Sequence, residues 1–351
     1  MAANGAMQSA RRRPEGRATL HEIARRAGVS ATTVSNVVNG KFEMMAAETR
    51  AQIERLIVEM NYRPSAAGRR LRLNRNHAIG LLVIDESPAF LADPFNTNII
   101  AGLGNHLNRN GFSLIVNGVA PDRLEEAVLL GRHDTDALCV IPSGTPRQRQ
   151  AVLRALGNAR QPLVVVQDGV PTWLADAASI RQDDEAGGRL IAERLLARGA
   201  RRLVMLVPRR PWPAMARREA GVRAVLEGAS ATLEVIAARS EEIDDCEAAL
   251  AASVAAHGLP DAVLGGNDQM AIAALLWLQA EGHAVPADVL VTGFNGFEFR
   301  RYARPALTSI RSPALALGEH AGALLIERVE TGHFPVTEVV LPVELIEGDS
   351  A

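Results

Sequence analysis

The sequence predicts a small all-α helix-turn-helix domain followed by an α/β core of two doubly wound parallel-sheet subdomains. Three observations lead to this prediction. Residues 19–39 contain two short amphipathic helix patterns separated by a glycine. From residue 78 onward, apolar runs of about four to six residues alternate with longer helical patterns. The 351 residues, 48% of them apolar, suffice for two or three domains and exclude a disordered protein.

The charge of the chain divides in the same way as the predicted domains. Residues 1–76 hold 14 Lys and Arg against 6 Asp and Glu, a net +8, and residues 77–351 hold 24 against 34, a net −10. A basic head suits contacts with phosphate groups, whereas DNA would repel the acidic body. Residues 1–18 are expected to be a disordered basic tail, whose arginines either add non-specific DNA affinity or are simply solvated.

Targeting signals are missing from the sequence. No apolar stretch has the length of a secretory h-region near the N-terminus or of a membrane span elsewhere. The two cysteines, Cys139 and Cys246, lie in apolar runs and are expected to be buried free thiols. A cytoplasmic location without membrane contact is therefore expected.

The helix-turn-helix prediction rests on the spacing of apolar side chains. Ile23, Ala24 and Ala27 share one face of the first helix, Gly28 forms the corner, and Ser30 is suited to N-cap the second helix. The second helix should bury Val34, Val37 and Val38 and expose Ala31, Thr32, Ser35 and Asn36. Small and amide side chains fit the major groove, where Asn pairs with adenine. An ordinary helical hairpin has the same spacing.

A family resemblance separates these alternatives. The segment resembles the start of lactose-repressor (LacI/GalR) family regulators, T-[IL]-x-[DE]-[IV]-A-x-x-A-G-V-S-x-x-T-V-S-x-V-[LV]-N-G, and it continues through Glu48-Thr49-Arg50 and Tyr62-Arg63-Pro64 to the C-terminus. The resemblance implies a homodimeric DNA-binding transcriptional regulator, expected to be a repressor, on a palindromic double-stranded operator. The matching positions are Thr19, Leu20, Glu22, Ile23, Ala24, Ala27, Gly28, Val29, Ser30, Thr33, Val34, Ser35, Val37, Val38, Asn39 and Gly40.

The resemblance also implies which residues contact DNA. They lie in the helix-turn-helix domain (19–63) and in a hinge helix or linker (64–76), whose Leu71 wedges into the minor groove. Gly68 stands where the family usually has Ala, which costs about 1 kcal/mol of helix propensity. Asn39 either contacts a phosphate or caps its helix. The full implied set is Thr19, Leu20, Ser30, Ala31, Thr32, Ser35, Asn36, Asn39, Ser65, Ala66 and Leu71.

The core, residues 77–351, is expected to bind the effector and to dimerise. Fully apolar strands indicate sheets covered on both faces, and the resemblance implies the bilobed fold of type I periplasmic-binding-protein-like domains. Chain crossovers near 178, 311 and 337 give an N-subdomain of about 78–178 and 312–337 and a C-subdomain of about 179–311 and 338–351. The apolar runs are 79–84, 113–116, 137–141, 162–166, 203–207, 262–266 and 289–294.

Ligands of such sheets bind beyond the carboxyl ends of the strands. The family comparison assigns Phe95, Arg218 and Asn267 to the ligand, with Asn295 in place of the family's Asp. Three candidate residues have alternative roles. Asn96 either makes the pocket polar or caps its helix, and Trp212 either stacks on a sugar or packs against its loop. Arg218 either reaches the ligand or is a surface arginine on its helix. Arg218 without a carboxylate at 295 suggests a sugar acid or keto acid instead of a neutral sugar. Asp168 and Asp184 are weaker candidates.

Catalysis has no support in the sequence. It holds no nucleophile elbow, no phosphate loop, no metal-ligand spacing among its eight histidines and no complete dinucleotide fingerprint, since Gly102 and Gly104 lie in a helix pattern and suit packing. No cofactor or metal is therefore expected, and the chain is not expected to be an enzyme. The alternatives are a solute-binding protein and a doubly wound enzyme without a DNA role.

Overall fold

The computed structural model describes residues 18–38, 40–42, 45–62, 75–85, 89–131, 134–158 and 161–351. The chain separates into two compact units, Met1–Asn76 and His77–Ala351, and each is described by itself. The predicted tail up to residue 17, Asn39 and the hinge residues Ser65, Ala66, Gly68 and Leu71 lie outside the described residues.

The first unit contains the predicted helix-turn-helix. α1 (Leu20–Ala27) begins at Thr19, whose hydroxyl accepts a hydrogen bond from the Glu22 N–H at 3.2 Å, and it ends at Gly28 in the left-handed conformation with φ 68°. α2 (Ala31–Val38) follows Ser30, whose hydroxyl accepts a hydrogen bond from the Thr33 N–H at 3.1 Å. Both the turn and the second N-cap agree with the sequence prediction.

The core of this unit fixes which face of α2 is exposed. Ile23, Val34 and Ile53 are fully buried where α1, α2 and α3 (Ala47–Glu59) meet. Thr32 and Asn36 are exposed as predicted, and Ser35 is half-buried. Ala31 is only half-exposed because it packs against the same core, so its predicted outward position is partly wrong, and Val38 is half-buried where full burial was expected.

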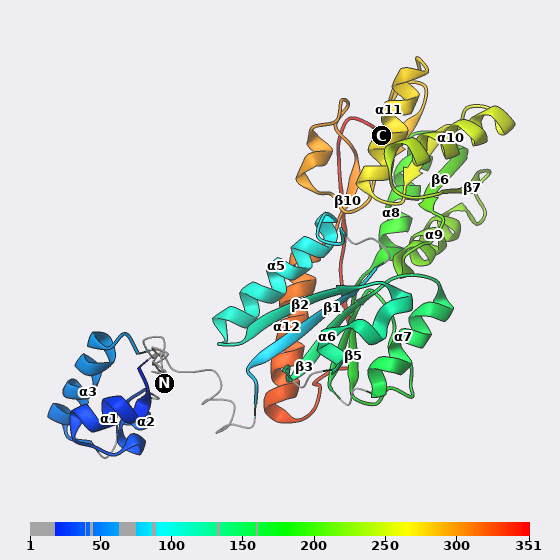
Figure 1. Ribbon diagram of the computed structural model, residues 1–351. Helices are drawn as coiled ribbons and strands as arrows, with labels where there is room; N and C mark the ends of the chain where they lie inside the picture. Colours follow the sequence, from blue (N-terminus) through cyan, green and yellow to red (C-terminus); the bar gives the residue numbers. More distant parts are fainter. Residues whose placement is uncertain are drawn as a thin grey trace, which may run out of the picture. The chain divides into compact units, whose positions relative to one another are not determined.

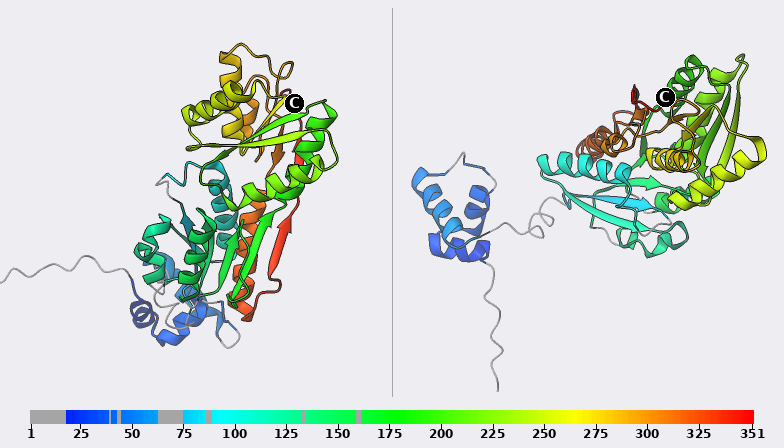
Figure 2. Two further views of the ribbon diagram at one scale, coloured as in Figure 1. Left: turned by 90° about the vertical axis from the view of Figure 1, so that its right-hand side faces the viewer. Right: turned by 90° about the horizontal axis from the view of Figure 1, so that it is seen from above.

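The second unit has two lobes (Figures 1 and 2). The N-lobe is built on a parallel sheet in the order β11-β5-β4-β3-β1-β2. Helices α5 and α12 cover one face, and η1, α6 and α7 cover the other. The elements are β1 (Ala78–Ile84), α5 (Pro94–Arg109), β2 (Ser113–Val119), η1 (Pro121–Glu126), α6 (Val128–Gly131), β3 (Ala137–Pro142), α7 (Pro146–Asn158), β4 (Leu163–Val166), β5 (Ala177–Gln182), α12 (Ala314–Thr331) and β11 (Glu338–Leu341).

The C-lobe repeats this architecture on a smaller parallel sheet in the order β7-β6-β8-β9. Helices α8 and α9 cover one face, α10 and α11 cover the other, and β10 pairs antiparallel with β12 beside them. The elements are α8 (Asp184–Ala197), β6 (Arg202–Pro208), α9 (Pro213–Leu226), β7 (Thr232–Ala238), α10 (Ile243–His257), β8 (Ala262–Gly265), α11 (Asp268–Ala280), β9 (Leu290–Thr292), η2 (Glu298–Arg301), β10 (Ser309–Arg311) and β12 (Glu344–Ile346).

The seven predicted apolar strands are all present as β1, β2, β3, β4, β6, β8 and β9, and both cysteines are buried and free. The lobe boundaries differ from the prediction. β5 and β11 both pair within the N-lobe sheet, so the chain crosses after Gln182 and after Leu341 and not near 178 and 337. The remaining crossing, between β10 and α12, lies where it was expected.

Helix pairs in each lobe approach so closely that only glycine fits between them. A Cβ atom on Gly102 of α5 would lie 2.0 Å from the Leu315 carbonyl oxygen of α12, and one on Gly318 would lie 2.1 Å from the Ile99 oxygen. Gly188 and Gly221 form the same reciprocal contact between α8 and α9, at 2.1 and 2.0 Å. The packing role predicted for Gly102 is thus confirmed.

Replacing Gly102 by Ala should separate α5 from α12 and lower the free energy of unfolding by about 2 kcal/mol or more, as overpacking does. The matched control is Gly104→Ala in the same helix, where the new Cβ would meet only the Leu114 side chain at 3.5 Å. That variant should be neutral or gain up to about 1 kcal/mol of helix propensity. Urea denaturation compares the two, and equal midpoints would contradict the role of the close approach.

Candidate functional site

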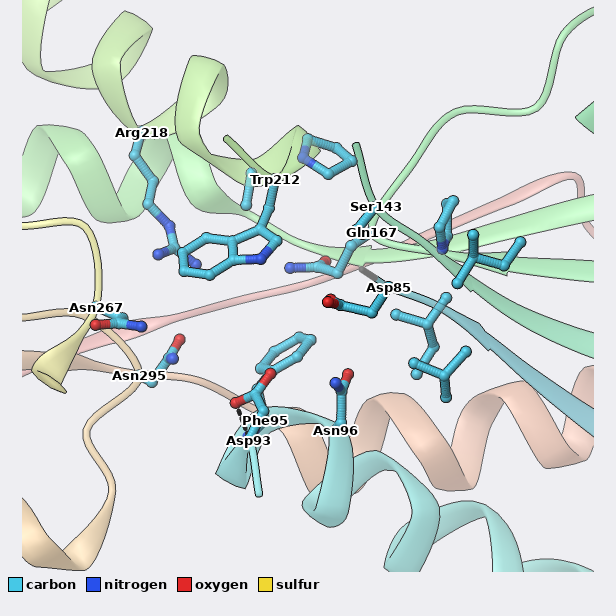
Figure 3. A pocket seen from close by; sticks show the side chains of 16 residues that line it. Asp85, Asp93, Phe95, Asn96, Ser143, Gln167, Trp212, Arg218, Asn267 and Asn295 are labelled. Atoms are coloured by element: carbon cyan, nitrogen blue, oxygen red, sulfur yellow. Dashed lines mark hydrogen bonds between the residues drawn. The ribbon is translucent and has the colours of Figure 1, made fainter. Parts of the chain in front are cut away.

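A pocket lies between the two lobes, at the carboxyl ends of strands from both sheets (Figure 3). This is the position where doubly wound sheets bind ligands. All six side chains predicted to contact an effector line it. The N-lobe contributes Val83, Ile84, Asp85, Asp93, Phe95, Asn96, Ile141, Pro142, Ser143 and Gln167, and the C-lobe contributes Trp212, Pro213, Ala214, Arg218, Asn267 and Asn295.

One aromatic ring from each lobe faces the pocket. Trp212 precedes the first turn of α9 in the C-lobe, and Phe95 lies in the first turn of α5 in the N-lobe. Figure 3 shows the two side chains on opposite sides of the pocket, with polar side chains around them. Flat apolar faces with polar groups at their edges suit a ring-shaped ligand that carries polar substituents.

The start of α5 resolves the two roles left open for Asn96. The helix is capped by Asp93, whose carboxylate accepts a hydrogen bond from the Phe95 N–H at 2.9 Å, so capping by Asn96 was the wrong alternative. Asn96 is buried, and its amide donates a hydrogen bond to the Phe90 carbonyl oxygen at 3.2 Å. It therefore holds the preceding loop while it lines the pocket.

Both ends of the Asn267 side-chain amide form hydrogen bonds within the protein, which the sequence did not indicate. Its Oδ1 caps α11 by accepting a hydrogen bond from the Met270 N–H at 2.9 Å, and its Nδ2 donates a hydrogen bond to Glu241 at 2.8 Å. The adjacent Asp268 accepts hydrogen bonds from the Ser309 hydroxyl and the Phe297 N–H. Asn267 therefore positions the pocket wall even without a ligand.

Asn295 differs from the other amides that line the pocket. It is 8% exposed, and its Oδ1 is buried without a hydrogen-bond partner among the described residues. The residue is held with φ 105° and by backbone hydrogen bonds that join it to Ile310 and Ser312. Because an unsatisfied buried carbonyl oxygen costs about 1–3 kcal/mol, this atom is suited to accept a hydrogen bond from a ligand.

Arg218 is buried, which excludes the alternative of a surface arginine. Its Nε donates a hydrogen bond to Asp184 at 2.9 Å, its Nη1 donates one to the Gly266 carbonyl oxygen, and the guanidinium plane lies 3.6 Å from the centre of the Phe294 ring. Burial lowers the pKa of Arg218, and the Asp184 carboxylate opposes this effect. The guanidinium thus reaches the pocket from a site where its charge is already paired.

Asp184 links the pocket to the crossings between the lobes. Its side chain is fully buried and accepts a hydrogen bond from Gln182 at 2.8 Å, while the Gln182 Oε1 accepts one from Ser312 at 2.6 Å. Asp183 is the cap of α8, so Asp184 is not a cap. An acidic ligand was expected because Arg218 faces no carboxylate at position 295, but Asp184 supplies the carboxylate that pairs with it.

Comparisons with known proteins agree with this geometry. Residues 19–65 match the description "Bacterial regulatory proteins, lacI family" and residues 192–351 match "Periplasmic binding protein-like domain". The transcriptional repressor PurR of Serratia proteamaculans (strain 568) is 32% identical over 89% of this chain and 90% of its own. The chain belongs to the lacI family of bacterial regulatory proteins.

Solved structures support the fold of this lacI-family regulator. The complex of the transcriptional regulator CelR with cellobiose has a TM-score of 0.69 and 26% identity, and the alignment covers 95% of this chain and 100% of that one. The lac repressor dimer bound to operator and an anti-inducer has a TM-score of 0.81 and 24% identity over 95% and 99% of the two chains.

Family membership decides between the alternatives left by the sequence. This lacI-family chain is a DNA-binding transcriptional regulator controlled by a small metabolite, so the predictions of a solute-binding protein and of a doubly wound enzyme were the wrong alternatives. Within the described residues, no helix is long and apolar enough to cross a membrane.

Among the polar groups at the pocket that the sequence did not indicate are Gln167 and Glu241. Gln167, with φ 63°, lines the pocket and accepts a hydrogen bond from the Gln182 N–H at 2.9 Å. Glu241 lies in the loop after β7, where its carboxylate accepts a hydrogen bond from Asn267, and it belongs to no recognisable motif. Asp168 pairs with Arg149 at 2.7 Å and is not part of the pocket lining. Position at a strand end would have indicated Gln167, but nothing in the sequence distinguishes Glu241.

Glu241 should make stability depend on pH. Its pKa is raised to about 7, chiefly by burial, with the hydrogen bond from Asn267 opposing the increase and the nearby Asp93 and Asp85 adding to it. Because the folded-state pKa lies above the ordinary value, the folded protein binds this proton more tightly than the unfolded chain does. Protonation of Glu241 therefore favours folding, and this contribution to the free energy of unfolding is lost as pH rises from the ordinary pKa through about 7.

Glu241→Gln keeps the hydrogen bond to Asn267 without the charge. Relative to the wild type, its free energy of unfolding should increase between pH 5 and pH 8 by on the order of 1–3 kcal/mol. Urea denaturation across this range measures the difference. Glu193→Gln at an exposed position of α8 is the control, and a parallel pH profile for Glu241→Gln and the wild type would contradict the assignment.

Proposed function

We propose that this regulator is a homodimeric repressor in the cytoplasm that holds a palindromic operator with the exposed faces of two α2 helices. Its affinity for the operator changes when a small effector binds between the lobes. The observation that carries this proposal is the interlobe pocket, which is lined from both lobes and contains the unpartnered buried oxygen of Asn295.

The DNA contact is assigned to the polar face of α2. Val34 and Val37 are buried in the head and fix the helix rotation, so that Thr32 and Asn36 face outward. An Asn side chain can form two hydrogen bonds with adenine in the major groove, and a Thr methyl group can contact thymine. The remaining contacts proposed, including Thr19, Leu20 and Ser30 in the head and Leu71 in the hinge, follow the family resemblance.

The effector is proposed to be a neutral sugar. Trp212 and Phe95 offer flat apolar faces, and the Asp93 carboxylate and the Asn295 oxygen can accept hydrogen bonds from hydroxyl groups. The regulator CelR, 26% identical, was solved with cellobiose, a neutral disaccharide. A sugar acid or keto acid is disfavoured because the pairing of Arg218 with Asp184 removes the free positive charge that the earlier expectation required.

The effector controls DNA binding through the relative orientation of the lobes. A ligand that contacts both lobes stabilises the orientation in which both sets of contacts form. In the described core, the three connections between the lobes follow β5, β10 and β11, and the Gln182–Ser312 hydrogen bond joins the first two. Couplings of this kind are typically about 1–3 kcal/mol.

Asn36→Ala should weaken operator binding by about 1–3 kcal/mol and relax the preference for one base pair in each half-site. Selection of binding sites from random DNA with the wild type and the variant measures both effects. Gln52→Ala, an exposed amide on α3, is the matched control and should keep the wild-type preference. An unchanged selected sequence for Asn36→Ala would contradict the role of α2.

A thermal-shift screen with neutral sugars, sugar acids and keto acids tests the effector. A sugar at about 100 times its Kd should stabilise the wild type by about 2.7 kcal/mol, and Asn295→Ala should reduce this shift. Asn295 is the better target than Arg218, since removing Arg218 would leave Asp184 buried without its partner.

Asn108→Ala, at an exposed amide of α5, is the control for the ligand screen and should retain the full shift. A hit that stabilises the Asn295→Ala variant as strongly as the wild type would place the ligand outside the pocket. It would also count against the proposed effector site.

A further inference from the structure

We propose that Asp184 determines the charge preference of the interlobe pocket, because its buried carboxylate neutralises Arg218 and thereby disfavours anionic ligands. This inference rests on the proposed function, in which the pocket holds a small effector. It assigns a role to a residue that does not line the pocket and that acts through the arginine in front of it.

Arg218 offers the ligand only part of its hydrogen-bonding capacity. Two of its nitrogens donate to the protein, Nε to Asp184 and Nη1 to the Gly266 carbonyl oxygen. One face of the guanidinium lies 3.6 Å from the centre of the Phe294 ring. A carboxylate or phosphate binds arginine best through a fork of parallel N–H groups, and here that fork is partly used.

The carboxylate of Asp184 is fixed and shielded from water. Its side chain has no exposed surface, and it accepts hydrogen bonds from Gln182 at 2.8 Å and from Gln167 at 3.5 Å. Salt and water screen a buried charge far less than a surface charge. An anion placed against Arg218 would therefore meet a repulsion from Asp184 that solvent and salt screen only weakly.

The other carboxyl groups around the pocket act in the same direction. Asp85 and Asp93 line it together with Arg218, and Glu241 contacts it through Asn267. Arg217 lies outside the lining, where it donates a hydrogen bond to the Gln167 carbonyl oxygen at 2.6 Å and approaches Asp184 at 3.5 Å. Carboxyl groups outnumber guanidinium groups in this set.

Asn295 shows why the position of the counterion matters. A carboxylate at this position would occupy the ligand space beside Arg218, whereas the amide there is neutral and its Oδ1 is unpartnered. The negative charge that balances Arg218 is instead placed behind it, at Asp184. The pocket thus keeps hydrogen-bonding groups for hydroxyls without gaining a positive charge that would attract acids.

Calorimetric titration of the full-length protein with inorganic phosphate tests this assignment. Asp184→Asn keeps the shape of the side chain and an oxygen for the Arg218 Nε, but it removes the charge. We expect this variant to bind phosphate at least tenfold more tightly than the wild type, which corresponds to about 1.4 kcal/mol. The double variant Asp184→Asn/Asn295→Asp returns a carboxylate to the pocket that Arg218 lines and should bind phosphate weakly again.

The matched control is Asp168→Asn, which removes a carboxylate from another arginine pair, with Arg149 at 2.7 Å, outside the pocket. It should leave phosphate affinity unchanged. Equal phosphate affinities of the wild type and Asp184→Asn would overturn the proposal. So would equal gains in Asp184→Asn and Asp168→Asn, because the effect would then not come from the pocket.

Folding of the variants also decides between a charge role and a purely structural one. If Asp184→Asn does not fold but the double variant does, Arg218 needs a counterion, and the proposal is supported. If neither folds, the Asp184 oxygens are needed for structure and the proposal fails. Operator binding by the wild type is measured separately, so that a chain without DNA affinity contradicts the proposed function and not the charge preference.

Discussion

The buried ion pair between Asp184 and Arg218 connects the parts of this regulator that must work together. Arg218 reaches the pocket from α9, and Asp184 begins α8 immediately after the chain leaves the N-lobe. Through Gln182 and Ser312 the same hydrogen-bonded group includes two of the connections between the lobes. Removing one partner of such a pair is costly, so the pocket wall and the connections between the lobes are coupled through it.

The pocket depends on a second constraint, which is that every parallel strand ends at the same edge of its sheet. Short polar segments after β1, β4, β8 and β9 are therefore enough to place their side chains around the same pocket. Several of these side chains are helix caps, as Asp93 and Asn267 are. The groups that could contact a ligand are thus positioned by the helix starts that they stabilise.

Much of this fold could be predicted from the sequence because seven strands have continuous apolar runs. β7 and β11, which are not among these seven, lie at sheet edges, and all their side chains except that of Ala238 are exposed or half-buried. At the site, the family resemblance at strand ends indicated Phe95 and Asn295. It did not indicate the partners of Arg218 and Asn267, because Asp184 and Glu241 lie 34 and 26 residues away in the chain.

The glycine contacts in the two lobes have a mechanical consequence. With the backbones of α5 and α12, and of α8 and α9, in direct contact through Gly102 and Gly188, no layer of side chains remains between them to be compressed. Each lobe is therefore stiff along the helices that begin at the pocket. A displacement of Phe95 or Arg218 on ligand binding is therefore expected to move both helices of its pair together.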